Sequence, residues 1–339
     1  MTQLGGAAGI AAPEAERRSA LEYLKGLLDK AGPIVAILIL GIFLSIRTDR
    51  FLTAQNFTNI VRQAASIGLI AIGMMLAILT GGIDLSVGAL MALSTILMGK
   101  AVQAGWPGLW PVLVCLASGF LLGAFNGLLL TKLKLPHPFI STMGTQNIFR
   151  GACLLLTAGT PISGMPPAVK WAGSSFVAGA LPVSALILIL VYLVFGFFLR
   201  NTTLGRHIYV VGGNTTTARL SGVNVDFTLV MVYALSGLMC GLAGLVLAGR
   251  VDAVYPMAGI GWETDAIAAV IIGGSSFFGG RGNILGTFSG LILISVLRNG
   301  LNLMNITPDM QTVILGTVII LAVFIDVVRN GGFAKVKKL

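Results

Sequence analysis

The sequence predicts an all-α fold, that of a polytopic integral membrane protein, and three observations support this prediction. Hydrophobic residues make up 56% of the 339 residues and charged residues only 10%, whereas a soluble domain carries about 25% charged residues. Apolar runs of the length that crosses a bilayer, about 20 residues, recur along the chain. Glycine accounts for 45 residues, and in lipid it lets helices approach closely. We expect about ten transmembrane helices, some of them short or broken.

Residues 1–30 are polar and precede the first apolar run. Three leucines share one helical face with basic residues around it, which predicts an amphipathic cytoplasmic helix at the membrane interface. Charged residues occupy the positions where a signal peptide would have its apolar core, so the sequence does not predict a signal peptide here. The membrane domain is then expected to cover 31–328, and a basic cytoplasmic tail covers 329–339.

Ten segments are apolar enough to cross a bilayer. They are 31–47, 57–80, 84–103, 110–131, 137–158, 181–200, 227–249, 265–280, 283–303 and 310–328. With the N-terminus inside, ten crossings put both termini in the cytoplasm. The inner segments then hold 14 of the 22 Lys and Arg residues and the outer segments hold five, which is the bias of the positive-inside rule. All four Trp residues fall on the outer side, where aromatic belts form.

The stretch LTGGIDLSVGAL, residues 79–90, predicts a break inside the membrane domain. Only Asp84 is charged between Ser66 and Gly99, a run that would be about 51 Å long as one helix, against a hydrocarbon core of about 30 Å. Gly81 and Gly82 can end a first helix. Asp84 can then accept from the free N–H groups that open the next helix, and it is also a candidate wall of a translocation path.

Uncharged polar groups are the other candidates for such a path. They are Ser86, Thr95, Asn126 and Asn147, weak hydrogen-bonding groups that suit a neutral polyol. Arg62, Arg150 and Arg298 fall within or near spans, and the expected intramembrane charges are Asp84, Arg150 and Arg298, without the carboxylate chain of an ion-coupled carrier. The energy for transport is therefore expected from another subunit. Glu263 and Asp265 are read as capping or solvated loop residues.

Repeated glycines predict close helix packing. The repeats are Gly119, Gly123 and Gly127, then Gly237 and Gly241, then Gly282, Gly286 and Gly290. Their four-residue spacing places each set on one helical face, as in small-xxx-small interfaces. The same spacing would suit helices that slide during a transport cycle, and the sequence leaves both readings open.

Signatures of catalysis, metal binding and nucleic-acid binding are missing from the sequence. It contains no zinc-protease, nucleophile-elbow or P-loop motif, and GRGNIL at 280–285 lacks the third Gly of a dinucleotide fingerprint. His137 and His207 read as interfacial polar residues, and the three Cys lie singly. Basic residues cluster between apolar runs and form no patch for nucleic acid. We expect a transporter without its own catalytic site, metal or cofactor.

The inner loop 200–226 contains a short predicted helix. Asn214 is a good N-cap and Gly222 a good helix stop, so about two turns lie between them with Arg219 exposed. This helix is either a solvated connector or a docking helix for a soluble partner.

Three stretches together resemble the permease subunits of ribose-type, or monosaccharide-type, ABC importers. They are LTGGIDLSVGAL at 79–90, GRHIYVVGGNTTTARLSGVNV at 205–225, and DAIAAVIIGGSSFFGGRGNILGT at 265–287 followed by NGLNLMNI at 299–306. The resemblance implies a homodimer in the bacterial inner membrane, a periplasmic sugar-binding protein outside and an ATPase inside. That ATPase has two fused nucleotide-binding halves and uses ATP and Mg.

The resemblance also implies which residues couple the chain to the ATPase. They are Gly205, Arg206, Gly212, Gly213, Asn214, Ala218, Arg219, Leu220, Ser221 and Gly222. It does not fix the sugar. Three other hypotheses remain: a secondary carrier or facilitator working alone, a branched-chain amino acid ABC permease, and a membrane enzyme.

Overall fold

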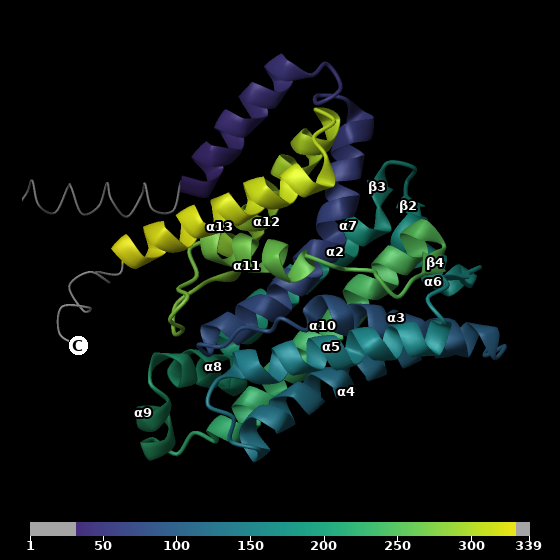
Figure 1. Cartoon of the computed structure of the whole chain (residues 1–339). Coiled ribbons are helices and arrows are strands. Elements are labelled where there is room, and N and C mark those ends of the chain that lie inside the picture. The colour runs from purple at the N-terminus through teal and green to yellow at the C-terminus, as the bar shows by residue number, and fades with distance from the viewer. Residues whose placement is uncertain (1–31, 330–339) are drawn as a thin grey trace, which may run out of the picture.

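The computed structural model describes residues 32–329 (Figure 1). The predicted N-terminal amphipathic helix and all but the first residue of the predicted basic tail lie outside this range. The long helices are Gly32–Arg47, α2 (Ala54–Leu79), α3 (Val87–Gln103), α4 (Trp110–Lys132), α5 (Pro138–Thr157), α7 (Val183–Asn201), α10 (Val225–Val251), α12 (Ile284–Leu303) and α13 (Pro308–Arg329). The shorter helices are α6 (Pro167–Ser174), α8 (Thr203–Gly213), α9 (Thr215–Leu220) and α11 (Trp262–Ile272).

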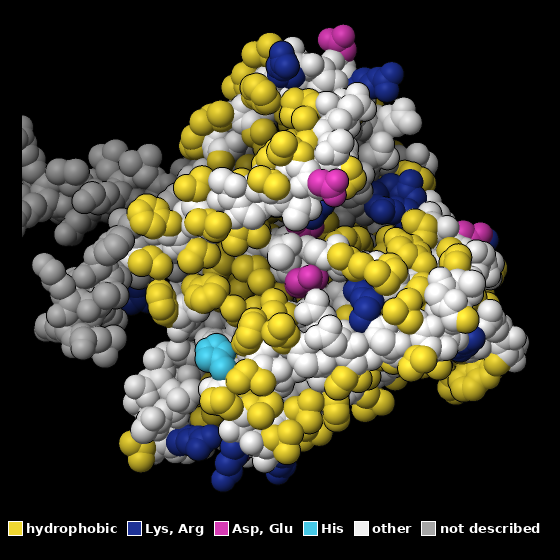
Figure 2. Space-filling view, in the orientation of Figure 1, with side chains coloured by type: hydrophobic (Ala, Val, Ile, Leu, Met, Phe, Trp, Pro, Cys, Tyr) yellow, Lys and Arg dark blue, Asp and Glu magenta, His cyan; other side chains and the backbone are white. Residues whose placement is uncertain are grey.

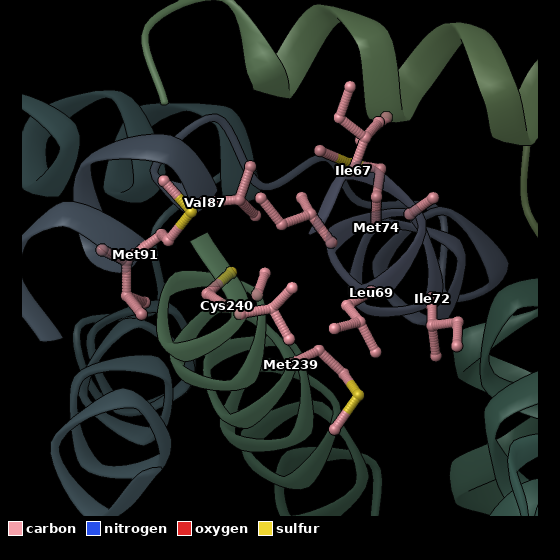
Figure 3. Close-up of a cluster of buried hydrophobic side chains, with 14 of the residues drawn as sticks. Ile67, Leu69, Ile72, Met74, Val87, Met91, Met239 and Cys240 are labelled. Carbon is pink, nitrogen blue, oxygen red and sulfur yellow. The ribbon is translucent and has the colours of Figure 1, made fainter. Parts of the chain in front are cut away.

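Helix α2 forms the centre of the fold. It packs against α7, α10, α11 and α12, and its residues from Ala64 to Leu79 are all buried. Figure 3 shows part of the resulting core, a cluster of buried side chains that includes Leu69 of α2, Met91 of α3 and Met239 of α10. This helix has 26 residues, so it is about 39 Å long and exceeds the hydrocarbon core of a bilayer.

Helices α4 and α10 are in direct backbone contact through glycine. A Cβ atom added to Gly123 would collide with the carbonyl oxygen of Tyr233, and one added to Gly237 would collide with that of Gly119. Gly286 and Gly290 of α12 lie equally close to the backbone of α11. These contacts confirm the predicted small-xxx-small packing, which in lipid replaces the missing hydrophobic drive between helices. The predicted place of Gly282 on the same helical face is wrong, since α12 begins at Ile284.

Two short antiparallel ladders and α6 lie between the long helices. Strand β1 (Ile162–Ser163) pairs with β4 (Ala253–Val254), and β2 (Phe176–Val177) pairs with β3 (Leu181–Pro182). The salt bridge from Lys170 to Asp252, with 2.8 Å between Nζ and Oδ2, joins α6 to the end of α10. The Pro- and Gly-rich segment 159–180 is thus folded against α7 and α10.

The class predicted from the sequence, an all-α polytopic membrane protein, is confirmed. Five of the described helices are long and apolar enough to cross a membrane, and large apolar side chains such as Leu155, Leu193 and Phe197 are exposed. Figure 2 shows hydrophobic side chains spread over much of one face. The predicted orientation and the count of ten crossings stay predictions.

The predicted span 265–280 is wrong in its extent. Helix α11 has 11 residues and ends at Ile272, so it measures about 17 Å and cannot cross a core of about 30 Å alone. The Gly273–Gly274 pair ends it, with Gly274 at φ +86°, a left-handed conformation that glycine adopts at little cost. Residues 273–283 then form a loop that leads to α12.

Candidate functional site

The break between α2 and α3 begins with a glycine cap. The N–H of Gly81 donates to the carbonyl of Ile78 over 2.9 Å, and the N–H of Gly82 donates to that of Ala77 over 3.0 Å. With Gly81 at φ +78°, this is the Schellman arrangement, which satisfies carbonyls that the helix end leaves free. Gly82 lies against Tyr233, whose hydroxyl oxygen would be 2.7 Å from an added Cβ.

Asp84 is fully buried just after this break. Its Oδ1 accepts from the N–H of Ser86 over 3.0 Å and from the hydroxyl of Ser86 over 2.6 Å. Its Oδ2 accepts from the hydroxyl of Ser236, on α10, over 3.3 Å. The predicted start of the next helix at residue 84 is wrong, since Ser86 occupies the N-cap position and α3 begins at Val87. Asp84 instead holds the turn that leads into α3.

Two further helices reach the same point. Asn126 of α4 donates from Nδ2 to the hydroxyl oxygen of Ser86 over 2.8 Å, and Thr142 of α5 donates to the carbonyl of Ile83 over 3.2 Å. The Ser86 hydroxyl donates its hydrogen bond to Asp84, and its oxygen accepts one from Asn126. The chain of hydrogen bonds therefore ends on the carboxylate of Asp84. We call Asp84, Ser86, Asn126 and Ser236 the Asp84 network.

The network leaves some hydrogen-bonding capacity unused. The Oδ1 atom of Asn126 and the hydroxyl of Tyr233 are buried, and neither has a hydrogen-bond partner within residues 32–329. Buried polar atoms usually have partners, so each such exception calls for an explanation. Here both belong to helices, α4 and α10, that border the break. A polar molecule or water passing the break would find an amide oxygen and a phenol hydroxyl available.

Three of the predicted path residues therefore lie together, and two do not. Asp84, Ser86 and Asn126 are joined in the network, whereas Thr95 is buried and bonds only to Ala92 of its own helix, over 2.8 Å. Asn147 is exposed and its Nδ2 donates to Met143 of its own helix over 3.0 Å.

Sequence reasoning missed Ser236 and Tyr233. Both are hydroxyl residues of one largely apolar predicted span, 227–249, and scattered hydroxyls in such a span carry no signal of their own.

No cationic side chain pairs with Asp84. Lys170–Asp252, Arg219–Asp226 and Arg298–Asp265 are salt bridges of other carboxylates, and the described residues hold no group of three or more His, Cys, Asp or Glu that would suit a metal. The network is built of hydroxyls, amides and one carboxylate that already accepts three hydrogen bonds. Such an arrangement ties helices together and can offer hydrogen bonds to a neutral polar molecule, but it contains no nucleophile–base pair.

Asp265 is a second buried charge, and the prediction that it is a capping or solvated loop residue is wrong. Its side chain is 1% exposed, and its Oδ1 accepts from Nη2 of Arg298 over 2.7 Å. Glu263 and Asp265 do lie in the first turn of α11, as predicted, but Asp265 faces α12 and not solvent. Close by in sequence, Asn299 of α12 and Asn56 of α2 exchange two amide hydrogen bonds of 2.8 and 3.0 Å.

Arg150 also has an interior partner. Its Nη1 donates to the carbonyl of Pro256 over 2.6 Å and to that of Ala258 over 2.9 Å. It thereby joins α5 to the segment between β4 and α11. Arg150 and Arg298, two of the charges expected within or near spans, are thus both bound by groups of the protein. An unpaired charge inside a membrane would be costly.

The predicted coupling segment forms two helices at one edge of the molecule (Figure 1). The short helix expected between Asn214 and Gly222 is confirmed as α9, since the Asn214 side chain accepts from the N–H of Thr217 over 2.8 Å and Gly222 has φ +81°. Helix α8, which precedes it, was not predicted. Its N-cap is Thr202, whose hydroxyl accepts from the N–H of Gly205 over 3.0 Å.

Helix α9 presents its polar face and one large apolar side chain to the outside. Ala218 is buried in a small core with Val211 and Val225, while Leu220 is 85% exposed. Arg219 is exposed and forms a 3.1 Å salt bridge with Asp226 at the start of α10. Arg206, Gly213, Asn214, Ser221 and Gly222 are exposed as well, and Gly205 is buried. Lys and Arg side chains gather near this end of the molecule in Figure 2.

Comparison with known proteins identifies relatives over almost the whole chain. A family model described as "Branched-chain amino acid transport system / permease component" matches residues 56–323. The ribose import permease protein RbsC of Bacillus subtilis (strain 168) is 42% identical over 90% of this chain and 94% of its own length.

Two other curated relatives carry related names. The D-allose transport system permease protein AlsC of Escherichia coli (strain K12) is 40% identical, over 88% of this chain and 91% of its own length. The fructose import permease protein FrcC of Rhizobium meliloti is 36% identical, over 94% of this chain and 91% of its own length. No solved structure matches the chain.

Proposed function

Because the chain belongs to the family of branched-chain amino acid transport system permease components, we propose that it is the membrane subunit of an ABC importer for a neutral monosaccharide. One observation carries this proposal. Relatives that align with about nine-tenths of the chain are named as permeases for ribose, D-allose and fructose. The permease itself hydrolyses nothing in this proposal; it provides the path and a partner ATPase provides the energy.

The proposed assembly is a homodimer in the bacterial inner membrane. A cytoplasmic ATPase with two fused nucleotide-binding halves, which uses ATP and Mg, docks on α8 and α9, and a periplasmic binding protein delivers the sugar on the other side. Support for the docking surface comes from the exposed Leu220 and from the basic residues expected on the same side. The same charge bias supports ten crossings with both termini in the cytoplasm.

The chemistry of the Asp84 network favours a neutral cargo over an amino acid. A zwitterion needs opposite charges along its path, but Arg298 and Asp265 bind each other, and Arg150 binds backbone carbonyls. Hydroxyl and amide groups, such as those of Ser86 and Asn126, match the hydroxyls of a sugar. The family description that mentions amino acids makes branched-chain amino acids the second candidate cargo.

The experiment is reconstitution of the chain in proteoliposomes with its ATPase and binding protein. ATP hydrolysis and uptake are measured over a panel of pentoses, hexoses and polyols, with leucine, isoleucine and valine as the competing set. We expect one sugar to stimulate both hydrolysis and uptake. A preference for the amino acids would select the second candidate, and uptake without the ATPase would replace the importer by a carrier working alone.

A further inference from the structure

Three glycine pairs that are far apart in the sequence meet at one place. Gly81–Gly82 ends α2, Gly212–Gly213 ends α8, and Gly279–Gly280 lies in the loop between α11 and α12. The N–H of Gly280 donates to the carbonyl of Leu79 over 2.9 Å, so the loop satisfies one of the carbonyls at the end of α2. We call this meeting point of Leu79, Gly81, Gly212, Gly279 and Gly280 the glycine junction.

The junction consists of backbone packed directly on backbone. A Cβ atom on Gly212 would collide with the carbonyl oxygen of Leu79 and would lie 2.7 Å from the nitrogen of Gly280. A Cβ atom on Gly279 would lie 2.8 Å from the nitrogen of Gly81 and 2.9 Å from the oxygen of Gly212. No side chain separates the end of α2, the end of α8 and the loop 273–283 at these contacts. A movement of one of these segments alone would therefore make its backbone collide with the other two or lose contact with them.

The neighbouring Gly213 provides an internal comparison. A Cβ atom on Gly213 would meet nothing within 4 Å, although the residue sits in the same helix turn as Gly212. The requirement for glycine at the junction is therefore specific to position 212 and does not follow from helix α8 as a whole.

A side-chain contact ties the same segments a second time. The hydroxyl of Tyr209, one turn before Gly213 on α8, donates to the carbonyl of Gly282 over 3.0 Å. Ile208, on the same helix, is fully buried in the main core. Helix α8 is thus held to the loop 273–283 by a hydrogen bond and to the end of α2 by close backbone contact.

The junction lies between the two functional regions described above. On one side, Asn214 follows Gly212 by two residues and opens the exposed helix α9. On the other side, Asp84 follows Gly81 by three residues and anchors the Asp84 network. Close-packed backbone transmits displacement, whereas flexible side chains absorb it. A shift of α8 and α9 therefore has to move the end of α2 and the break that follows.

Building on the proposed function, we propose that Gly212 is a positioning residue through which the docking segment α8–α9 sets the position of the break that holds Asp84. Its missing side chain allows the contact with Leu79, and this contact carries the displacement. The loop 273–283 closes the junction from the third side, which gives a role to its glycine pair and to Tyr209. The residue acts on the path without touching the cargo.

The test compares Gly212→Ala with Gly144→Ala in the reconstituted complex with ATPase and binding protein; Gly144 is exposed on α5, and a Cβ atom added there meets nothing within 4 Å. The readouts are co-purification of the ATPase, ATP hydrolysis and uptake of the sugar found for the unaltered chain. For Gly212→Ala we expect an assembled complex that still hydrolyses ATP, with uptake per ATP lowered by at least about 10-fold. For Gly144→Ala we expect the unaltered ratio. A purely structural role would lower the yield and leave the ratio unchanged.

If the Gly212→Ala protein does not insert into the membrane, a milder variant tests the same proposal. Tyr209→Phe removes one hydroxyl and should also lower uptake per ATP, though less, while Tyr255→Phe, which alters the segment between β4 and α11, should not. If the assembled Gly212→Ala complex, or Tyr209→Phe in its place, keeps the unaltered ratio of uptake to ATP hydrolysis, the glycine junction does not connect the docking segment α8–α9 to the break that holds Asp84. If the unaltered complex shows no ATP-driven sugar uptake, the proposed function fails, whatever the variants do.

Discussion

Arg298 of α12 binds the buried carboxylate of Asp265 on α11 over 2.7 Å. This contact joins the short helix α11, which cannot cross a bilayer alone, to a helix that can. Helix α11 has only 11 residues, and this contact anchors its first turn to α12. The pair holds one charge of each sign, so neither is left bare in the interior of the bundle.

The variant Arg298→Met should strongly destabilise the protein. It leaves the Asp265 carboxylate buried without a cation, and breaking a buried pair in this way costs about 3–5 kcal/mol. Thermal unfolding in detergent micelles measures the loss. The double variant Arg298→Met with Asp265→Asn should recover much of it, and Asp226→Asn, which breaks an exposed pair, should cost less than about 1 kcal/mol. Equal losses in all three would contradict the assignment.

Asp84→Asn and Asp84→Leu separate two roles of Asp84. Asparagine keeps an acceptor for the N–H and hydroxyl of Ser86, so folding should be nearly unchanged. Leucine leaves buried donors unpaired, at about 1–3 kcal/mol for each, and should lower the thermal stability clearly. Uptake by the folded Asp84→Asn protein decides the second role: impaired uptake places the carboxylate in the path, and unaltered uptake makes it a structural anchor alone. Asn147→Ala, on an exposed face, is the control for folding.

Much of the local structure could be predicted from the sequence, because it depends on neighbouring residues. The break after Leu79 follows from Gly81 and Gly82, and helix α9 follows from Asn214 and Gly222. Such caps act over a few residues and have recognisable residue types. The early end of α11 could not be predicted in the same way, since residues 273–280 are as apolar or small as a span.

The missing parts of the site depend on contacts between distant segments. Ser236 donates to Asp84 across 152 positions, and one serine in an apolar run has no pattern that marks its partner. The sequence predicts a capping or solvated loop role for Asp265 because its neighbours are Trp262 and Glu263, whereas its partner Arg298 lies 33 residues away. The contacts of Gly212 with Leu79 and Gly280 likewise join segments that are far apart in the sequence.

Gly123→Ala should disrupt the contact between α4 and α10. The added methyl group would collide with the carbonyl oxygen of Tyr233, and overpacking typically costs about 1–3 kcal/mol or more where backbone has to move. Gly144→Ala on α5 is the matched control, since an added Cβ there meets nothing within 4 Å. Thermal unfolding of the two purified variants should therefore differ clearly, and a Gly123→Ala protein as stable as Gly144→Ala would contradict the packing.

The pair Lys170–Asp252 should make stability depend on acid. Lys170 and the N–H of Met165 hold the pKa of Asp252 below its ordinary value of 3.8. A lowered pKa means that the folded state favours the charged form, so the stabilisation is present above about pH 4 and is lost as pH falls through the lowered pKa. Asp252→Asn should therefore reduce the acid sensitivity of unfolding below pH 4 and leave the pH dependence at neutral pH unaltered. If the unaltered protein and Asp252→Asn were equally sensitive to acid, the Lys170–Asp252 pair would not be the source of the acid sensitivity.

Leu220→Asp should weaken binding of the partner ATPase. Leu220 is 85% exposed on α9, and under the proposed docking on α9 this large apolar side chain would be buried in a pocket of the ATPase only in the complex. Truncation of such an anchor costs about 2 kcal/mol or more, so the amount of ATPase that co-purifies should fall by at least about 10-fold. The side chain touches no core cluster, so thermal stability of the permease alone should stay unchanged. Met257→Asp, at an exposed apolar residue of the segment between β4 and α11, changes the charge equally and should not affect ATPase binding. If both variants retain the ATPase, it docks elsewhere, and the functional reading of α9 reverts to that of a solvated connector.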